Sequence, residues 1–347
     1  RRRIEDGGPV TVEFEIEDRG SGIGELVLKV NGQRRDRPGE RRPITTRREG
    51  LVVRETWNLD LPAGEHELSV EVASADGRLR SPPERLTVEV DDPFAAAPAL
   101  WGIAIGVTDY YDGALNLEWP ALDAERVHDL LEAQERRIFR AADIRLLRDE
   151  DATAARIARE FEAIASEIQP QDVFVFYLAG HGEVWKGNYH FVPYEAAFTS
   201  RPSFLKQSLD EAELVDLLAT INADKRVVMV DTCYAGAFDT VVERSIADKT
   251  ALDRLMRASG DVWLAASSDR ETALEGYKRH GVFTYAVLEG LRGAADPLGD
   301  NHVSVDELAD FLEDEVPELS YRAFGKRQVP MRHFSGVDFD LARYERR

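Results

Sequence analysis

Apolar and polar residues alternate with period two along roughly the first ninety positions, as in strands that bury one face. Asn31-Gly32 interrupts the alternation with the turn signal of a two-residue hairpin, and Asp76-Gly77 and Ser81-Pro82-Pro83 separate later runs. The apolar positions of these runs are Val10, Val12, Phe14 and Ile16; Leu26, Leu28 and Val30; Leu68, Val70 and Val72; and Leu86, Val88 and Val90. Short strands separated by turns predict an antiparallel β-sandwich over residues 1–92.

The rhythm changes after residues 93–99, which are predicted to be a linker. Uninterrupted apolar runs then indicate strands buried on both faces, and apolar spacings of three and four indicate helices between them. The strand runs are Trp101–Val107, Val173–Leu178, Val227–Val230 and Val262–Ala266. Four helices are predicted: one that begins at Pro120, one that contains Ile157, Phe161, Ile164 and Ile168, one that follows a capping box of Ser208 and Glu211, and one over Phe283–Leu291. Residues 100–347 are therefore predicted to form an α/β domain with a mostly parallel sheet flanked by helices.

Composition narrows the class of partner. The 347 residues carry a formal charge of −21, which disfavours a nucleic-acid partner because phosphate neutralisation needs basic residues. No apolar run approaches the roughly 20 residues that span a bilayer, so no membrane segment is expected. The single cysteine excludes an intramolecular disulfide and favours a cytoplasmic location, while the compartment itself stays unknown. Because Arg1–Glu5 has no methionine and no signal-peptide core, we expect an internal point of a longer chain or a processed end.

Two of the predicted strands end in reactive residues. The run that begins at Val173 leads into Gly180-His181-Gly182, and the run that begins at Val227 leads into Asp231-Thr232-Cys233. The carboxyl ends of parallel strands meet at one edge of a sheet, so His181 and Cys233 are expected to lie close together.

Such a pair can perform nucleophilic catalysis. The imidazole of His181 can take the proton of the Cys233 thiol and later protonate a leaving amine. The glycines beside His181 let the backbone approach a substrate, and the amides of Gly182 and Cys233 are candidate oxyanion donors. Taken alone, Cys233 is better explained as a small buried residue than as a nucleophile, and His181 is equally well explained as a turn residue. Together, at two strand ends, they are harder to explain by packing.

The segment Leu100–Phe339 resembles a peptidase domain of the caspase superfamily, close to bacterial caspase-like proteins and metacaspases. His181-Gly182 matches the histidine block of that family, and Asp231–Gly236 matches its Asp-x-Cys-x-x-Gly block. The separation of 52 positions between the two residues also matches the family. The Gln-Ala-Cys-x-Gly form of animal caspases is absent, which points to the metacaspase side. The resemblance implies a caspase-like cysteine endopeptidase that acts on protein or peptide substrates.

The first 92 residues resemble, in pattern only, the immunoglobulin-like modules that precede enzymatic domains in many bacterial proteins. The expected architecture is therefore an immunoglobulin-like sandwich followed by the caspase-like domain.

The family resemblance also implies a substrate preference. In metacaspases an aspartate two residues before the cysteine, here Asp231, lines an acidic pocket for the Arg or Lys side chain before the scissile bond. A second pocket aspartate at the start of the first helix corresponds to Asp123. The alternative is that Asp123 is only a first-turn aspartate that stabilises the helix dipole. The family has a further polar residue two positions before the histidine, where this chain has Ala179. That departure puts the depth of the pocket and the preference itself in question.

Two further segments match the family. The polar stretch Phe238–Gly260 contains Arg244, Lys249, Arg254 and Arg257 and corresponds to a region of processing cuts, with a solvated loop as the alternative. Ala265–Asp269 corresponds to a segment that flanks the substrate groove.

No cofactor is expected. The histidines lack metal-binding spacing, and one cysteine cannot build a zinc site. Asp296–Glu307 resembles a calcium loop but lacks an oxygen ligand at position three and a glycine at position six, and a capping box of Ser304 and Glu307 explains it better. Calcium dependence stays open, because some metacaspases require calcium through other acidic residues.

The sequence thus predicts a cysteine endopeptidase, with a latent or non-catalytic caspase-like scaffold as the alternative. An upstream sensor or activating partner that holds the enzyme inactive is compatible with the two-domain layout. The substrate protein, the activating signal and the oligomeric state are not encoded in any motif.

Overall fold

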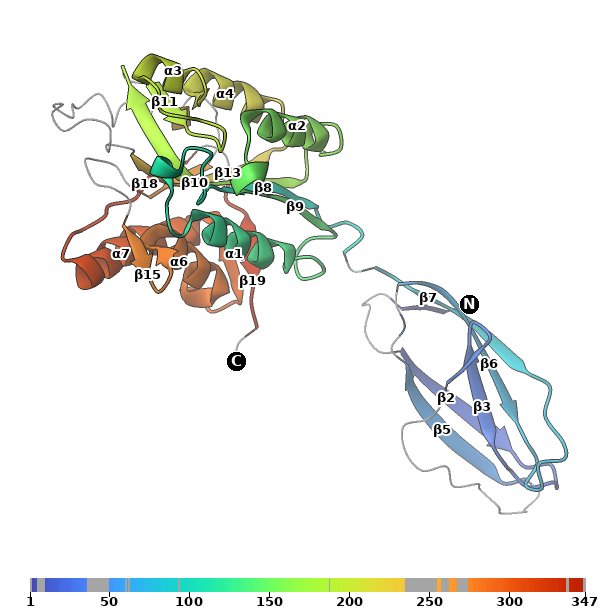
Figure 1. Cartoon of the computed structure of the whole chain (residues 1–347). Coiled ribbons are helices and arrows are strands. Elements are labelled where there is room, and N and C mark those ends of the chain that lie inside the picture. The colour runs from blue at the N-terminus through green and yellow to red at the C-terminus, as the bar shows by residue number, and fades with distance from the viewer. Residues whose placement is uncertain are drawn as a thin grey trace. The chain divides into compact units, whose positions relative to one another are not determined.

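The computed structural model divides the chain into two compact units, Arg1–Ala96 and Ala97–Arg347, each with its own apolar core (Figure 1). Among the helices it describes, none is long and apolar enough to cross a membrane. The described residues are 2–4, 10–35, 50–59, 61, 63–92, 94–186, 188–234, 255–256, 262–266, 274–334 and 337–345.

The first unit consists of strands in two sheets. One sheet has the order β1-β7-β6-β3-β4, and β2 pairs with β5 in the other. All pairings are antiparallel except that between β1 and β7. Val12 of β2 and Leu68 of β6 belong to one buried cluster, so the two sheets share a core. The strands are β1 Arg2–Ile4, β2 Val10–Glu17, β3 Leu26–Val30, β4 Gln33–Arg35, β5 Val52–Leu59, β6 Gly64–Val72 and β7 Glu84–Val90.

The predicted hairpin turn lies between β3 and β4. Asn31 and Gly32 have φ values of 50° and 78°, and positive φ at both central residues is what a two-residue hairpin turn requires. The period-two pattern did not predict β5, because only Trp57 and Leu59 of that strand are buried.

The second unit is built on an eight-stranded sheet. β9, β8, β10, β13 and β14 are neighbours in that order and run parallel. β18 joins β14 antiparallel, and β11 and β12 extend the far end of β10 antiparallel. These strands are β8 Leu100–Gly106, β9 Ala142–Arg148, β10 Val173–Trp185, β11 Asn188–Phe191, β12 Leu209–Asp210, β13 Lys225–Tyr234, β14 Val262–Ala265 and β18 Met331–His333.

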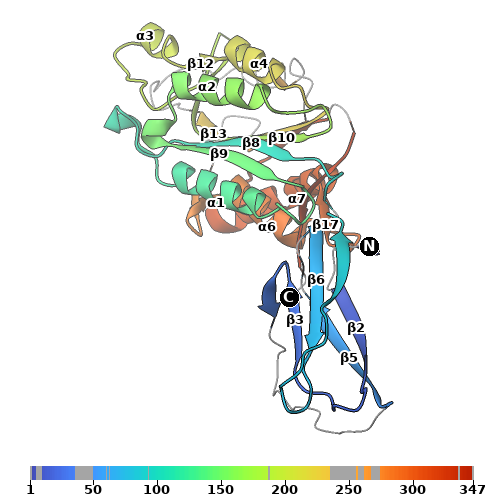
Figure 2. The same ribbon diagram turned by 90° about the vertical axis from the view of Figure 1, so that its right-hand side faces the viewer.

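Helices cover both faces of this sheet (Figures 1 and 2). α1, α6 and α7 lie on one face, and Leu131, Phe283 and Leu308 from these helices fill the core there. α2, α3 and α4 lie on the other face, where Phe161 and Leu218 are buried. The predicted mostly parallel sheet flanked by helices is therefore confirmed. The helices are α1 Pro120–Glu132, α2 Ala154–Ala165, α3 Arg201–Leu205, α4 Glu211–Ala219, α6 Val282–Glu289 and α7 Val305–Phe324, with short turns η1 Gly113–Leu115, η2 Asp149–Asp151 and η4 Gly290–Ala294.

Two small two-stranded sheets complete the unit. β15 pairs with β16 as a hairpin, and β17 pairs with β19 near the end of the chain. They are β15 Glu275–Tyr277, β16 His280–Gly281, β17 His302–Ser304 and β19 Asp340–Arg343.

The predicted capping box of Ser208 and Glu211 is wrong. Asp210 and Glu213 form the box at the start of α4. The Ser208 hydroxyl instead donates a hydrogen bond to the Leu205 carbonyl. The residues after Ser208 pair with β11 as strand β12, so the helix begins later than predicted.

The capping box of Ser304 and Glu307 is confirmed at the start of α7. The carboxylate of Asp296, the first position of the calcium-loop pattern, accepts hydrogen bonds from the backbone amides of Gly299 and Asn301. The loop is thus organised by its own amides.

Candidate active site

β10 and β13 bring the two candidate catalytic residues together. The strands run parallel and pair from Val173 to Gly182, so both end at the same edge of the sheet. In this register His181 stands directly opposite Cys233, and Ala179 stands opposite Asp231. The side chain of Cys233 lies outside the described part of the structure, whereas its backbone belongs to β13.

The imidazole of His181 is held in one tautomer. Its Nε2 lies 2.8 Å from the carbonyl oxygen of Leu115, and a carbonyl can only accept, so Nε2 carries a proton. Nδ1 is buried and has no hydrogen-bond partner among the described residues. Burial lowers the pKa of His181 below its usual 6.5, against the opposing effect of the Leu115 hydrogen bond. The neutral ring therefore presents an unshared electron pair at Nδ1.

The loop between β8 and α1 provides the contacts that fix His181. The Tyr110 hydroxyl accepts a hydrogen bond of 2.8 Å from the backbone amide of His181, and the two rings lie 5.2 Å apart. The turn η1 places Leu115 in the same loop, capped by the side chain of Asp112. Sequence reasoning missed both residues, because a backbone carbonyl carries no side-chain signal and Tyr110 stands in no recognisable motif.

The glycine before His181 is required by the tyrosine. Gly180 has φ +143°, a conformation that L side chains rarely adopt, and a Cβ there would lie 2.8 Å from the Tyr110 hydroxyl. A Cβ at Gly182 would meet Thr232 and Tyr189 at 2.9 Å. The glycines were predicted to let a substrate approach closely, and in the structure the side chains of Tyr110, Tyr189 and Thr232 approach them. Gly182 lies inside β10, between Phe191 of β11 and Tyr234 of β13, and its oxyanion role stays a prediction.

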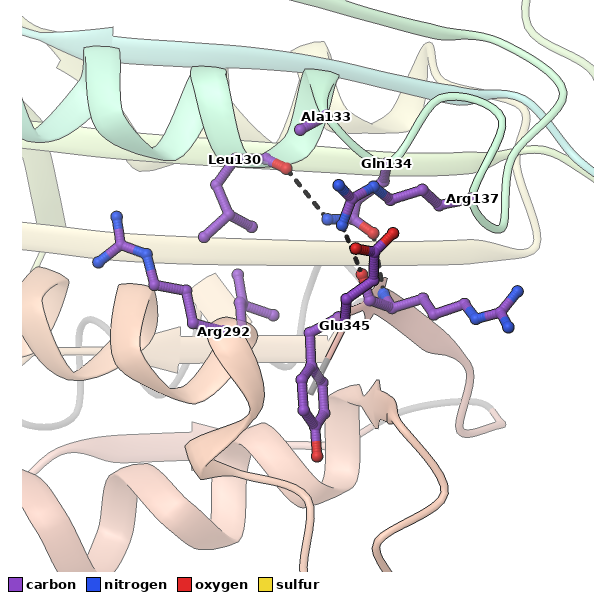
Figure 3. A pocket seen from close by; sticks show the side chains of 9 residues that line it. Leu130, Ala133, Gln134, Arg137, Arg292 and Glu345 are labelled. Atoms are coloured by element: carbon purple, nitrogen blue, oxygen red, sulfur yellow. Dashed lines mark hydrogen bonds between the residues drawn. The ribbon is translucent and has the colours of Figure 1, made fainter. Parts of the chain in front are cut away.

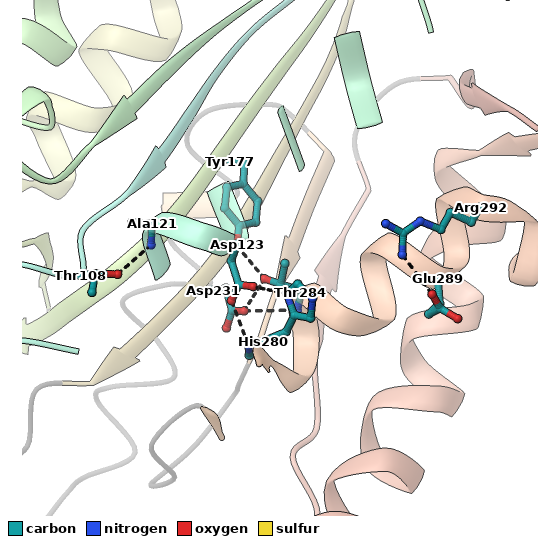
Figure 4. A network of polar contacts seen from close by, with 10 residues as sticks. Thr108, Ala121, Asp123, Tyr177, Asp231, His280, Thr284, Glu289 and Arg292 are labelled. Carbon is teal, nitrogen blue, oxygen red and sulfur yellow. Dashed lines mark hydrogen bonds and ion pairs between the residues drawn. The ribbon is translucent and has the colours of Figure 1, made fainter. Parts of the chain in front are cut away.

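The two predicted pocket aspartates also meet (Figure 4). Asp123 comes from the first turn of α1 and Asp231 from the end of β13, and both are buried. A Cβ built at Gly281 would lie 2.6 Å from Oδ2 of Asp231 and 3.4 Å from Oδ2 of Asp123, so both carboxylates face the same small space.

The partners of these carboxylates come from one hairpin and the helix that follows it. Asp123 accepts a hydrogen bond of 2.9 Å from the amide of Gly281, and its Oδ1 lies 2.5 Å from Nδ1 of His280. Asp231 Oδ2 accepts bonds of 3.2 Å and 2.6 Å from the amide and hydroxyl of Thr284. Burial raises the pKa of Asp123, and the bonds from His280 and Gly281 oppose that shift. No pattern in the sequence singled out His280 or Thr284.

Several predictions concern residues that the structure covers only in part. Of the predicted processing segment Phe238–Gly260, only Leu255 and Met256 are described, and both are buried. Ala265 and Ala266 of the predicted groove segment are buried, and the rest of that segment lies outside the described residues. Within the described part, no group of three or more His, Cys, Asp or Glu side chains could hold a metal ion.

A separate pocket of about 970 Å³ lies along the C-terminal half of α1 (Figure 3). It contains none of the predicted site residues. Its lining is Leu130, Ala133, Gln134, Arg137, Leu291, Arg292, Arg343, Tyr344 and Glu345.

Residues 100–341 match the model of a protein family described as Caspase domain. The match covers more than half of the chain, and the chain belongs to this family, whose members are cysteine-type endopeptidases. No curated protein sequence matches the chain at a significant level.

Solved structures to which the chain is similar include a protein from Geobacter sulfurreducens and caspase-1 from Spodoptera frugiperda. The first is 15% identical, with a TM-score of 0.47, and the match covers 69% of this chain and 94% of that one. The second is 11% identical, with a TM-score of 0.43, and the match covers 72% of this chain and 91% of that one.

Proposed function

We propose that the chain is a cysteine endopeptidase in which Cys233 is the nucleophile and His181 the general base and acid. The observation that carries the proposal is the register of β10 and β13, which pairs the two residues at the carboxyl edge of the sheet. Nδ1 of His181 is buried and has no partner among the described residues, which supports the proposal, since Nε2 is already hydrogen-bonded to the Leu115 carbonyl. Nδ1 is therefore the atom we assign to the transfer of protons.

The reaction proceeds through a thioester. The Cys233 thiol loses its proton to Nδ1 of His181 as its sulfur attacks the scissile carbonyl carbon. The C–N bond breaks, the imidazolium returns the proton to the leaving amine, and the acyl group remains on sulfur. A water molecule, deprotonated by the neutral imidazole, then attacks the thioester and restores the thiol. The lowered pKa of His181 favours a neutral resting pair over a preformed thiolate–imidazolium pair.

Cleavage after Arg or Lys is the substrate preference that we assign. Asp123 and Asp231 direct carboxylate oxygens at one small space, which suits a guanidinium or ammonium group and disfavours an acidic side chain. The amides of Gly182 and Cys233 are proposed to stabilise the oxyanion, each contributing about 3–4 kcal/mol to transition-state binding.

The alternative is a caspase-like scaffold without catalysis. A buried nitrogen that no described residue pairs with costs stability, and a scaffold has no need of it. A general base, in contrast, needs that nitrogen unoccupied. The unpaired Nδ1 therefore favours the enzyme over the scaffold.

Fluorogenic peptides ending in Arg, Lys, Asp or Ala test the proposal, with wild type and Cys233→Ala compared in the presence and absence of calcium. We expect hydrolysis of the Arg and Lys peptides by wild type only. Circular dichroism confirms that the variant is folded. Cleavage after Asp or Ala alone would overturn the preference, and equal activity in the variant would overturn the nucleophile. If folded wild-type protein cleaves none of the peptides under either condition, the scaffold is the better account.

A further inference from the structure

The hairpin β15–β16 carries three consecutive basic residues at its tip, Lys278, Arg279 and His280. Lys278 and Arg279 have φ values of 51° and 72°, so both central residues of the turn adopt a left-handed conformation without being glycine. Such backbone strain persists only where the surrounding contacts hold it in place. The side chains of the tip are therefore expected to make specific contacts with the rest of the domain.

Each basic residue of the tip rests on a group of the site or its rim. His280 contacts Asp123 at 2.5 Å, with only 17% of the His280 side chain and 3% of the Asp123 side chain exposed. The guanidinium of Arg279 lies 5.7 Å from the ring of Trp119, which directly precedes α1. Lys278 donates a 2.7 Å hydrogen bond to the Tyr285 hydroxyl.

The backbone of the hairpin also fills the space above the two carboxylates. The amide of Gly281 donates to Asp123, and even one methyl group at this position would lie 2.6 Å from an oxygen of Asp231. His280 contacts Oδ1 of Asp123 and the amide of Gly281 donates to Oδ2, so a substrate Arg or Lys side chain must compete with the hairpin for both oxygens. Figure 4 shows His280 pointing at the aspartates from the hairpin side.

We propose that His280 is a resident occupant of the acidic pocket, held there by the hairpin tip, and that a substrate's Arg or Lys side chain binds by displacing it. The inference rests on the proposed function and adds a specificity filter to it. An acidic side chain is repelled by Asp123 and an apolar side chain offers it no hydrogen-bond donor, so the pocket stays closed to both. The hairpin thus acts as a pseudosubstrate of the chain itself.

Displacement lowers the apparent affinity of any basic ligand by the fraction of molecules in which the pocket is open. Removing the imidazole therefore tightens binding. If about one molecule in ten is open, the gain is about tenfold. His280 competes with the substrate side chain for the pocket, so its removal is expected to lower KM.

The test uses full-length protein and benzamidine, an amidinium compound that imitates the Arg side chain. The variants are His280→Ala and His280→Gln, the second of which retains a hydrogen-bond donor. His128→Ala is the matched control, because His128 contacts Asp129 at 3.1 Å on the same helix as Asp123 but away from the pocket. Dissociation constants come from calorimetry, and KM and kcat come from the Arg peptide.

We expect benzamidine to bind at least one His280 variant about tenfold more tightly than wild type, and the control to bind like wild type. If the variants bind benzamidine as weakly as wild type or more weakly, His280 is not a competing occupant and the inference is overturned. If binding tightens but no variant cleaves any peptide, the inference about the pocket stands and the proposed hydrolysis fails. If the Arg peptide is cleaved while the Kd of benzamidine is unchanged, hydrolysis stands and the inference fails.

Discussion

Two features of its surroundings determine the tautomer of His181 and keep its ring neutral. The Leu115 carbonyl fixes the proton on Nε2, and burial disfavours a second proton on Nδ1. Tyr110 anchors the backbone at the same residue. The ring is thereby ready to accept a proton at Nδ1, its ring nitrogen that has no partner among the described residues.

The pH dependence of hydrolysis follows from the sign of this shift. Because the pKa of His181 is lowered below 6.5, the base stays neutral to lower pH than a free histidine would. We expect the acidic limb of kcat/KM on the Arg peptide to have its midpoint below pH 6.5. The same shift contributes folding stability that is present above about pH 6.5 and is lost as the pH falls through the lowered pKa. An acidic limb centred above pH 6.5 would contradict this assignment.

The sequence predicted some of these residues and not others, for physical reasons. His181, Asp231 and Cys233 follow buried apolar runs, and strand ends in a parallel sheet share an edge, so their proximity was predictable. Leu115 contributes only a carbonyl oxygen, which any residue could provide. His280 reaches Asp123 across 157 positions, a distance that no local pattern records.

Among the elements, the strands that present the site are joined at their starts by one buried carboxylate. Asp172 accepts hydrogen bonds from the amide of Ala99, the indole of Trp101 and the amide of Gln169, and it pairs with Arg140 at 3.1 Å. These groups belong to the starts of β8, β9 and β10 and the turn before β10. The carboxylate thereby holds the approaches to three parallel strands in register.

Removing this carboxylate tests its role. In Asp172→Ala, Arg140 and three N–H donors lose their acceptor, so we expect the free energy of unfolding to fall by about 3–5 kcal/mol. Asp224→Ala is the control, because Asp224 is exposed and, within the described part of the chain, only its backbone amide is hydrogen-bonded; we expect a change of about 0.5 kcal/mol or less. Denaturant titration measures both. Similar small losses in the two variants would show that Asp172 does not organise the strand starts.

The elements were predictable where one periodicity dominates. α1 begins at Pro120 and buries Ala124, Val127 and Leu131, as its spacing indicates. The apolar spacing continues to Ile168, but α2 ends at Ala165. Ile168 is buried without being part of the helix, so its apolar side chain did not mark the helix end. β9 mixes charged and apolar residues in no clear period, since it is the edge strand beside β8.

At the scale of the whole molecule, strand order decides which residues meet. The sequence predicted a parallel sheet, but the order of its strands depends on which face each connecting helix covers, and no local pattern specifies that. The placement of β13 directly beside β10 turns two separate motifs into one site. The chain carries a formal charge of −21, which attracts basic substrates at long range and agrees with the proposed acidic pocket.

The most direct test of the central claim is covalent labelling of the single cysteine by peptidyl ketones with a leaving group, one ending in Arg and one in Asp. Mass spectrometry of the intact and digested protein measures the extent and position of the label. We expect the Arg reagent to place one label on Cys233 in wild type, the Asp reagent to place none, and His181→Ala to react roughly 10²–10⁴ times more slowly. Equal labelling by both reagents, or a rate that does not depend on His181, would contradict the account.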